Sequence, residues 1–274
     1  MDEWWAFVLL VAMTLIEPYG KYNIKRAYES DILDTKRLVL GNVLIIILTP
    51  TLHFLSYTIV SGYFVSPIMA LSIFWNLMFA WYLKEGDSFS IQTLLMMLVF
   101  SMGMGLTFAA YLDGTGKDKE TSQVPNWDNT VLYLGLWVAF LSGLLSLGLF
   151  SERKSVFFYA WCAAGGILGS LDVVMNIETV SLGYDHHTTN EVGIAVLLGL
   201  LALFSQAGLI LLTNALLKRY DLHRVNPIIV AVNLFGDILA DLLVFSRFDS
   251  WGWIHYLGLV VGIGLMSVSM LKLS

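Results

Sequence analysis

Residues 192–217 read VGIAVLLGLLALFSQAGLILLTNALL, a stretch without a charged side chain. A helix needs about 20 mostly apolar residues to cross the ~30 Å hydrocarbon core of a bilayer, so this segment is long and apolar enough to span a membrane. The rest of the chain is similar, because 57% of its 274 residues are hydrophobic and only 13% are charged. Soluble domains carry about 25% charged residues. We therefore expect an all-α membrane protein.

Composition and motifs exclude several other classes of protein. With 5 Pro and 1 Cys, the chain fits neither a disordered or collagen-like protein nor a disulfide scaffold. The net charge of −6 and the lack of a basic patch interleaved with aromatic residues argue against nucleic-acid binding. The sequence contains no metalloprotease, serine-hydrolase, phosphate-loop or dinucleotide-binding motif. We expect neither an enzyme nor a bound cofactor.

Nine segments are long and apolar enough to be transmembrane helices. They cover residues 4–22, 38–58, 62–83, 92–112, 130–150, 156–176, 192–217, 226–246 and 252–271. The chain opens with MDEWW, which lacks the positive charge of a signal peptide, so we expect the first span to be retained. The longest connecting segments are 29–37, 113–129 and 178–191. None can hold a soluble domain, and residues 1–274 are predicted to form a single transmembrane domain.

The basic residues predict how the chain is oriented, because cytoplasmic loops are enriched in Lys and Arg. With nine spans and the N-terminus outside, twelve of the 15 basic residues fall on the cytoplasmic side. They are Lys21, Lys25, Arg26, Lys36, Arg37, Lys84, Arg153, Lys154, Lys218, Arg219, Arg224 and Lys272. We expect an integral, multi-pass protein with its N-terminus outside and its C-terminus in the cytoplasm, in a membrane that the sequence does not identify.

Two segments resemble each other and are predicted to enter the membrane from opposite sides. Residues 65–70 read VSPIMA and open the third span, and residues 225–230 read VNPIIV and open the eighth. Inverted repeats are typical of secondary transporters, whose two halves move about a site near the membrane midplane. We expect Pro67 and Pro227 to start symmetry-related helices in approximate halves 1–125 and 126–274. The alternative is that proline is simply common in the first turn of a helix.

Around these segments the chain resembles the drug/metabolite transporter (DMT) superfamily, and within it the NIPA-type magnesium transporters. Residues 53–57, HFLSY, look like the family's Asn-Phe-x-Ala-Tyr, and residues 64–72, FVSPIMALS, look like its Leu-Val-Thr-Pro-Leu-Gly-Ala-Leu-Ser. Similar matches follow in the family's order at 83–85 (LKE), 169–173 (GSLDV), Gln206, 214–216 (NAL) and 225–228 (VNPI). The resemblance implies an inverted-repeat bundle of about nine helices that transports Mg²⁺.

The chain departs from that family pattern at three positions. Pro50 stands where the family tends to carry an acidic residue, Asp172 stands in place of Ser, and Ile177 in place of Lys. The resemblance therefore supports the fold and transport more strongly than it supports magnesium as the substrate.

Two carboxylates lie four residues apart in the eighth predicted span. Asp237 and Asp241 share one helix face, and Asp237 lies ~17 Å along the helix from Asn226, near the membrane midplane. A charge there costs about 2.5–3.5 kcal/mol on insertion scales. Two like charges at this spacing stay ionised only with a cation nearby; otherwise one binds a proton. We predict a cation or proton site at this pair, with hydrogen bonding to neighbouring helices as the alternative.

Other polar residues in the spans are candidates for the same pathway. Asp172 and His53 are predicted to face an outer vestibule, although Asp172 could be a capped interfacial acid and His53 a packing residue. Glu17 precedes Pro18, where a helix kink would fit a pathway, but Glu17 could instead pair with Lys21 one turn later. Asn76 and Gln206, with Asn176, Asn214 and Asn233, could line the pathway or form interhelical hydrogen bonds.

These observations lead to a functional hypothesis. We expect a transporter that moves a cation, with Mg²⁺ favoured by the resemblance, and Asp237 and Asp241 as its metal ligands. The first alternative is a proton-coupled exporter or exchanger of a small organic metabolite or cationic drug. The second is a membrane scaffold that transports nothing. The expected partners are membrane lipid and the transported cation or metabolite, with a homodimer left open.

Overall fold

The structure, a computed structural model, describes residues 3–52, 55, 71–83, 91–114, 127–151, 153–185, 189–244 and 252–273. All regular secondary structure in these ranges is helical. The helices are α1 (Glu3–Glu29), α2 (Thr35–Val43) with the π-helix η1 (Leu44–Leu48), α5 (Ser72–Tyr82), α6 (Ile91–Gly114), α7 (Trp127–Phe150), α8 (Lys154–Asp185), α9 (Thr189–Leu217), α10 (Leu222–Leu243) and α11 (Trp253–Leu273). Because Thr35–Leu52 is one continuous helical segment, the described helices form nine rods, as predicted.

Several helices extend beyond the predicted spans. Helix α1 continues to Glu29, and α8 continues to Asp185, so the predicted connection at 178–191 is helical up to that residue. Helix α10 begins at Leu222, so Pro227 lies inside the helix and does not start it. Hydropathy predicts only the part of a helix that is apolar, whereas backbone hydrogen bonds continue into polar sequence. Leu222 is fully buried, and its packing explains the early start of α10.

Three helical segments are long and apolar enough to cross a membrane: Thr35–Leu52, Asn129–Phe150 and Val192–Leu217. Only 17%, 17% and 33% of their respective apolar windows are buried inside the protein. Large exposed apolar surfaces are rare on soluble monomers. The outward-facing apolar side chains are therefore compatible with an integral membrane protein.

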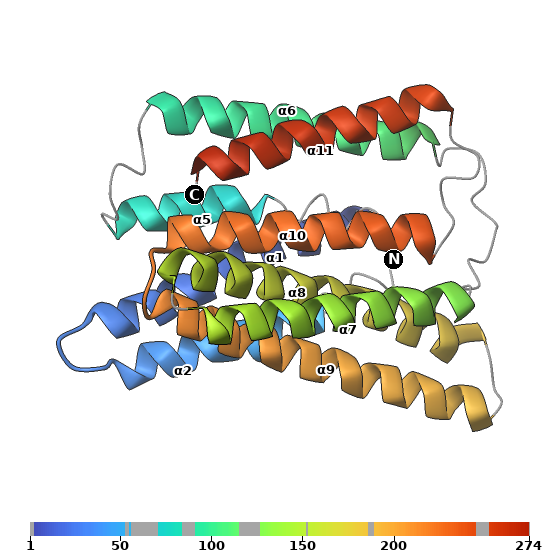
Figure 1. The fold of residues 1–274 in the computed structure, drawn as a ribbon, viewed down its shortest axis with the longest axis horizontal. Coiled ribbons are helices and arrows are strands. Elements are labelled where there is room, and N and C mark those ends of the chain that lie inside the picture. Colours follow the sequence, from blue (N-terminus) through green and yellow to red (C-terminus); the bar gives the residue numbers. More distant parts are fainter. Residues whose placement is uncertain are drawn as a thin grey trace.

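Successive helices alternate in direction along one long axis (Figure 1). The connections at 30–34, 151–153 and 218–221 lie at one end together with the C-terminus, and the N-terminus lies toward the other. We call the first of these the basic end, because it carries nine exposed basic residues. They are Arg26, Lys36, Arg37, Arg153, Lys154, Lys218, Arg219, Arg224 and Lys272.

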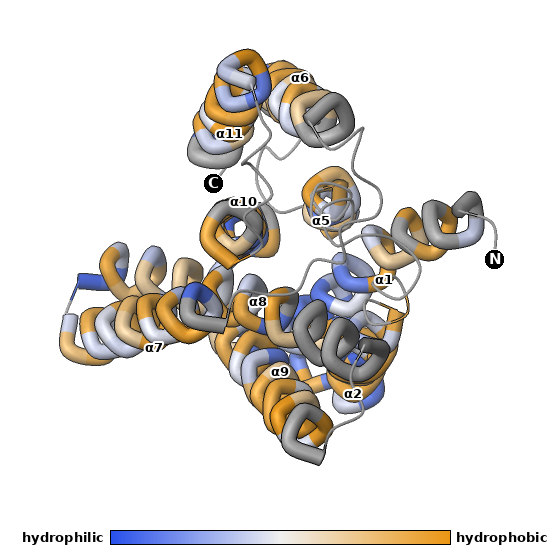
Figure 2. Tube along the Cα trace, turned by 90° about the vertical axis from the view of Figure 1, so that its right-hand side faces the viewer, coloured by the Kyte–Doolittle hydropathy of each residue, from blue (hydrophilic) through white to orange (hydrophobic). Residues whose placement is uncertain are grey.

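Helix α10 lies at the centre of the bundle. Viewed along the helices, α6 and α11 form a pair on one side, and α5 and α10 separate this pair from α1, α2, α8 and α9 (Figure 2). Buried side chains of α10 contribute to all three hydrophobic clusters of the described core: Leu234 to the cluster with α6 and α11, Ala240 to the cluster with α7, α8 and α9, and Ile229 to the cluster with α1 and α9. A polar residue on the buried faces of α10 is consequently enclosed by other helices.

Glycines allow two of these helix pairs to approach closely. A Cβ atom on Gly103 of α6 would lie 2.6 Å from the carbonyl oxygen of Gly262 on α11. On α8, a Cβ on Gly166 would lie 2.7 Å from the carbonyl oxygen of Ile229 on α10. Small residues at such crossings are typical of helix packing in membranes.

Candidate functional site

Helix α10 carries a row of polar side chains on one face. Asn226, Asn233 and Asp237 are separated by seven and four residues, a spacing that returns to the same side of a helix. Asn226 is fully buried, Asn233 is half-buried, and Asp237 is 7% exposed. We call these three side chains the polar face of α10. Because Asp237 is buried, its carboxylate is enclosed by the bundle and does not face lipid.

Asp172 of α8 lies at nearly the same level as Asp237. A Cβ on Gly169 would lie 3.1 Å from the side chain of Asn233, and Gly236 contacts Ser170. Because higher residue numbers on α8 contact higher residue numbers on α10, the two helices run parallel here. One further turn along both helices reaches Asp172 on α8 and Asp237 on α10, which therefore lie at about the same level. Asp172 is 4% exposed, so its carboxylate, like that of Asp237, is buried among the helices.

Tyr133 of α7 supports this pair of helices. Its hydroxyl group shares a hydrogen bond of 2.7 Å with Ser170 Oγ and donates one of 3.0 Å to the carbonyl oxygen of Gly236. Tyr133 is 1% exposed. The phenol thus ties α7 to both helices within two residues of Asp172 and one residue of Asp237. The sequence analysis did not identify Tyr133, and an isolated Tyr in an apolar span offers no pattern that would.

A second buried polar cluster joins α1 to the polar face of α10. The Lys21 ammonium lies 2.5 Å from Glu17 Oε1 and also donates a hydrogen bond to Asn226 Oδ1. The pairing of Glu17 with Lys21 is the second of the two interpretations made from the sequence, and it is confirmed. Lys21 lies near the end of the first predicted span, and its side chain is 4% exposed, because α1 continues for two more turns.

Lys25, one turn beyond Lys21, is buried as well. Its Nζ donates a hydrogen bond of 3.0 Å to the carbonyl oxygen of Tyr220 and lies 3.6 Å from Asp221 Oδ1 and 3.8 Å from Glu29 Oε1. Lys25 therefore lies within α1, which continues past the predicted end of the first span. Lys25 anchors α1 to the turn between α9 and α10, where its two carboxylate partners reach solvent.

Gln206 makes an interhelical hydrogen bond to the π-helix. The backbone N–H of Thr49 bonds to the carbonyl of Leu44, so the carbonyl of Ile45 loses its usual donor four residues later. The residue five positions later is Pro50, which has no N–H. Gln206 Nε2 donates to this Ile45 carbonyl at 3.2 Å. The hydrogen-bonding alternative for Gln206 is thus observed, and its pathway role remains a prediction.

Four asparagine amides keep a buried hydrogen-bonding atom without a partner among the described residues: Oδ1 of Asn76, Asn214 and Asn233, and Nδ2 of Asn226. Asn76 is 2% exposed on α5, which packs against α10, and its Nδ2 donates to the Ser72 carbonyl. Asn214 bonds to Asn42 Oδ1 of α2 at 2.8 Å. Most buried amides satisfy their hydrogen bonds, so the four unused atoms are suited to water or to a polar ligand.

Some predicted residues lie outside the part of the structure that is described. These are His53 and Pro67, together with the side chain of Asp241, whose backbone continues α10 one turn beyond Asp237. Their assignments remain predictions. Among the described residues, no group of three or more His, Cys, Asp or Glu side chains is placed to hold a metal ion. A transported Mg²⁺ needs fewer protein ligands, because it keeps several of its waters.

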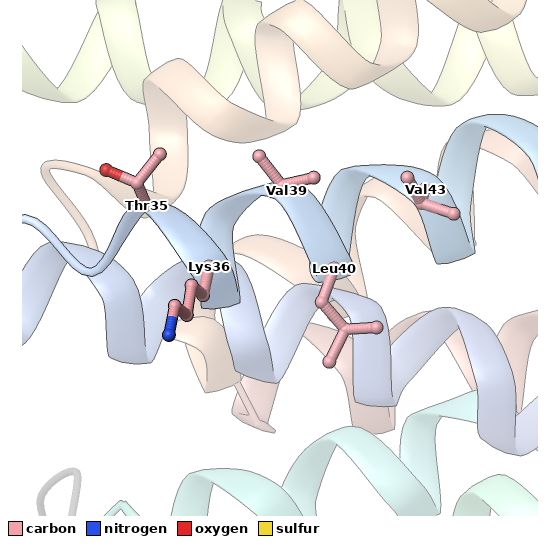
Figure 3. Close-up of a pocket in the computed structure, with 5 residues that line it drawn as sticks. All are labelled: Thr35, Lys36, Val39, Leu40 and Val43. Carbon is pink, nitrogen blue, oxygen red and sulfur yellow. The ribbon is translucent and has the colours of Figure 1, made fainter.

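A shallow pocket of about 470 Å³ lies on the outer face of α2 (Figure 3). Its lining consists of Thr35, Lys36, Val39, Leu40 and Val43. All five residues come from one helix, and Thr35, Val39 and Val43 point to one side while Lys36 and Leu40 point to the other. The pocket is therefore a surface feature of α2 and contains none of the buried carboxylates.

Comparison with known proteins adds no relative to this description. No protein-family model, curated protein or solved structure matches the chain.

Proposed function

We propose that the protein is a multi-pass membrane transporter of the DMT type that moves a cation along the polar face of α10. Mg²⁺ is the cation that the sequence resemblance favours. The observation that carries the proposal is the burial of two carboxylates, Asp172 on α8 and Asp237 on α10, at about the same level of two packed helices. Ionisable residues within transmembrane segments commonly mark substrate, ion or proton pathways.

The side chains at the level of Asp172 and Asp237 suit a hard cation. Carboxylate and amide oxygens are the ligands that Mg²⁺ accepts, usually one or two carboxylates with retained waters. Asn233, one turn from Asp237, has an unused Oδ1 that can accept hydrogen bonds from such waters. Ser170 is adjacent and already oriented by Tyr133. A hydrated divalent cation would compensate two carboxylates that otherwise repel each other in a low-dielectric interior.

Helix packing supports the proposal of an inverted repeat. Helix α1 packs against α2 and α5, and α8 packs in the same way against α9 and α10. Each of these groups of three is followed by one more helix, α6 in the first and α11 in the second. Helices α6 and α11 pack against each other, and so do α5 and α10. Helices α5 and α10 run in opposite directions (Figure 1). With the N-terminus outside, the basic end would face the cytoplasm, as the positive-inside rule requires.

Flux measurements with the purified chain in liposomes test this function. We expect Mg²⁺ uptake that is lost in Asp237→Asn, which keeps the side-chain shape but removes the charge, and reduced in Asp172→Asn. Asn129→Asp adds a carboxylate near the start of α7 and serves as a control for expression and insertion. Normal Mg²⁺ flux in Asp237→Asn would refute the proposed site. Flux of an organic amine that follows a proton gradient would instead support the proton-coupled alternative.

A further inference from the structure

The cluster of Glu17, Lys21 and Asn226 places a fixed cation on the proposed pathway. Asn226 and Asp237 belong to the same polar face of α10, separated by eleven residues or about 17 Å. Glu17 precedes Lys21 by one turn of α1, and α1 runs antiparallel to α10 (Figure 1). Because Lys21 contacts Asn226, Glu17 lies between the level of Asn226 and the level of Asp237.

We propose that Glu17 is a second cation station of the pathway and that Lys21 is the tethered cation that occupies it. A lysine ammonium and a mobile cation bear the same charge and use the same carboxylate oxygen. In a low-dielectric interior one carboxylate does not neutralise both. The station is therefore open to a passing cation only when Lys21 Nζ leaves Glu17. This inference rests on the proposed function, because it takes the passing ligand to be a cation.

Asn226 provides the place to which Lys21 can move. An ammonium group only donates hydrogen bonds, and Asn226 Oδ1 already accepts one from Lys21 Nζ. Lys21 can therefore release Glu17 without losing every hydrogen bond. Asn226 is fully buried and its Nδ2 has no partner among the described residues, so the amide can also rotate or bind a ligand oxygen. Lysine has the long flexible stem that such an exchange requires.

Cation binding to the full-length protein in lipid nanodiscs tests the inference, with Mg²⁺ as the first probe and Na⁺ and methylammonium as the next. The variant Lys21→Met removes the tethered cation and keeps the length of the side chain. We expect the half-saturating cation concentration in a thermal-stability titration to fall by about tenfold, the scale of a typical coupling between two ligands of one protein. The gain must disappear in the double variant Lys21→Met/Glu17→Gln. Lys21→Arg should behave like the parent protein.

Lys25→Met is the matched control, since Lys25 lies on the same helix, is similarly buried and has carboxylate partners of its own. Lys25→Met should show no increase in cation affinity that depends on Glu17. Size-exclusion elution and thermal unfolding report whether each variant folds. The double variant leaves no unpaired charge at this pair, and we therefore expect it to fold even if Lys21→Met alone is unstable. The titrations are repeated at a second, alkaline pH.

Two results would overturn the inference. One is a Lys21→Met titration equal to that of the parent protein for all three cations at every pH. The other is a gain in cation binding that persists in the double variant, because Glu17 would then not be the station. Both outcomes are separate from a failure of the proposed function. Flux that depends on Asp237 without a gain in Lys21→Met would refute the station alone, whereas Glu17-dependent binding without flux would refute transport alone.

Discussion

Replacement of Gly166 by Ala tests whether the close approach of α8 and α10 builds the site. The new Cβ would lie 2.7 Å from the Ile229 carbonyl oxygen and 2.5 Å from Val232 Cβ, where ordinary contact starts at 3.4 Å. The helices must therefore separate by about 0.9 Å at the Val232 contact, since a Cβ atom or a backbone carbonyl in a helix has little freedom to move aside. Overpacking of this kind destabilises by about 1–3 kcal/mol. It would also shift Asp172 relative to Asp237.

The control is Gly143→Ala, at a helical glycine of α7 with nothing within 4 Å of the added Cβ. Both substitutions gain the same intrinsic helix preference of Ala over Gly, about 1 kcal/mol, so the difference between the two variants isolates the contact between α8 and α10. Equilibrium unfolding in mixed detergent micelles measures this difference, and a Mg²⁺ titration measures the effect on the site. If Gly166→Ala is as stable as Gly143→Ala and binds Mg²⁺ equally well, the geometric argument for the site is wrong.

Two further substitutions test single hydrogen bonds. Tyr133→Phe removes the hydroxyl that bonds to Ser170 and to the Gly236 carbonyl; we expect a loss of about 1–2 kcal/mol in the free energy of unfolding together with weaker Mg²⁺ binding. Equal Mg²⁺ affinity in the two proteins would contradict the supporting role of the phenol. Gln206→Leu leaves the buried Ile45 carbonyl without its donor, and we expect unfolding measurements to show a loss of about 1–3 kcal/mol, with unchanged Mg²⁺ affinity if Gln206 serves only the π-helix.

The helices were largely predictable from the sequence because their signal is local. A run of apolar residues predicts a buried or lipid-facing helix from its length alone, and each of the nine predicted segments coincides at least in part with a described helix. The ends were less predictable. Lys21 lies near the end of the first predicted span and Lys25 lies beyond it, yet α1 buries both, because their partners Asn226 and Asp221 come from a helix and a turn about 200 residues away.

The candidate site was predictable only in part, for the same reason. The position of Asp237 in an apolar helix and the burial of such a charge follow from sequence and physics. Its proximity to the level of Asp172 depends on which faces of α8 and α10 meet, and that is decided by Gly166 and Gly169. Glycines in an apolar span predict close packing but not the partner helix. The roles of Tyr133 and Ile45 depend on such long-range contacts as well.

The order of charges along α10 has a consequence for any transport through this bundle. A cation that reaches Asp172 and Asp237 is attracted there, and about 17 Å further toward the basic end it meets the ammonium of Lys21 against Asn226. The same arrangement cannot both hold the cation at the carboxylates and let it leave past Lys21. Release at the basic end therefore requires α1 and α10 to move apart, or Lys21 to swing aside. Pro18 and Pro227 lie next to Glu17 and Asn226 inside these two helices, and each removes a backbone hydrogen bond at the place where that movement is needed.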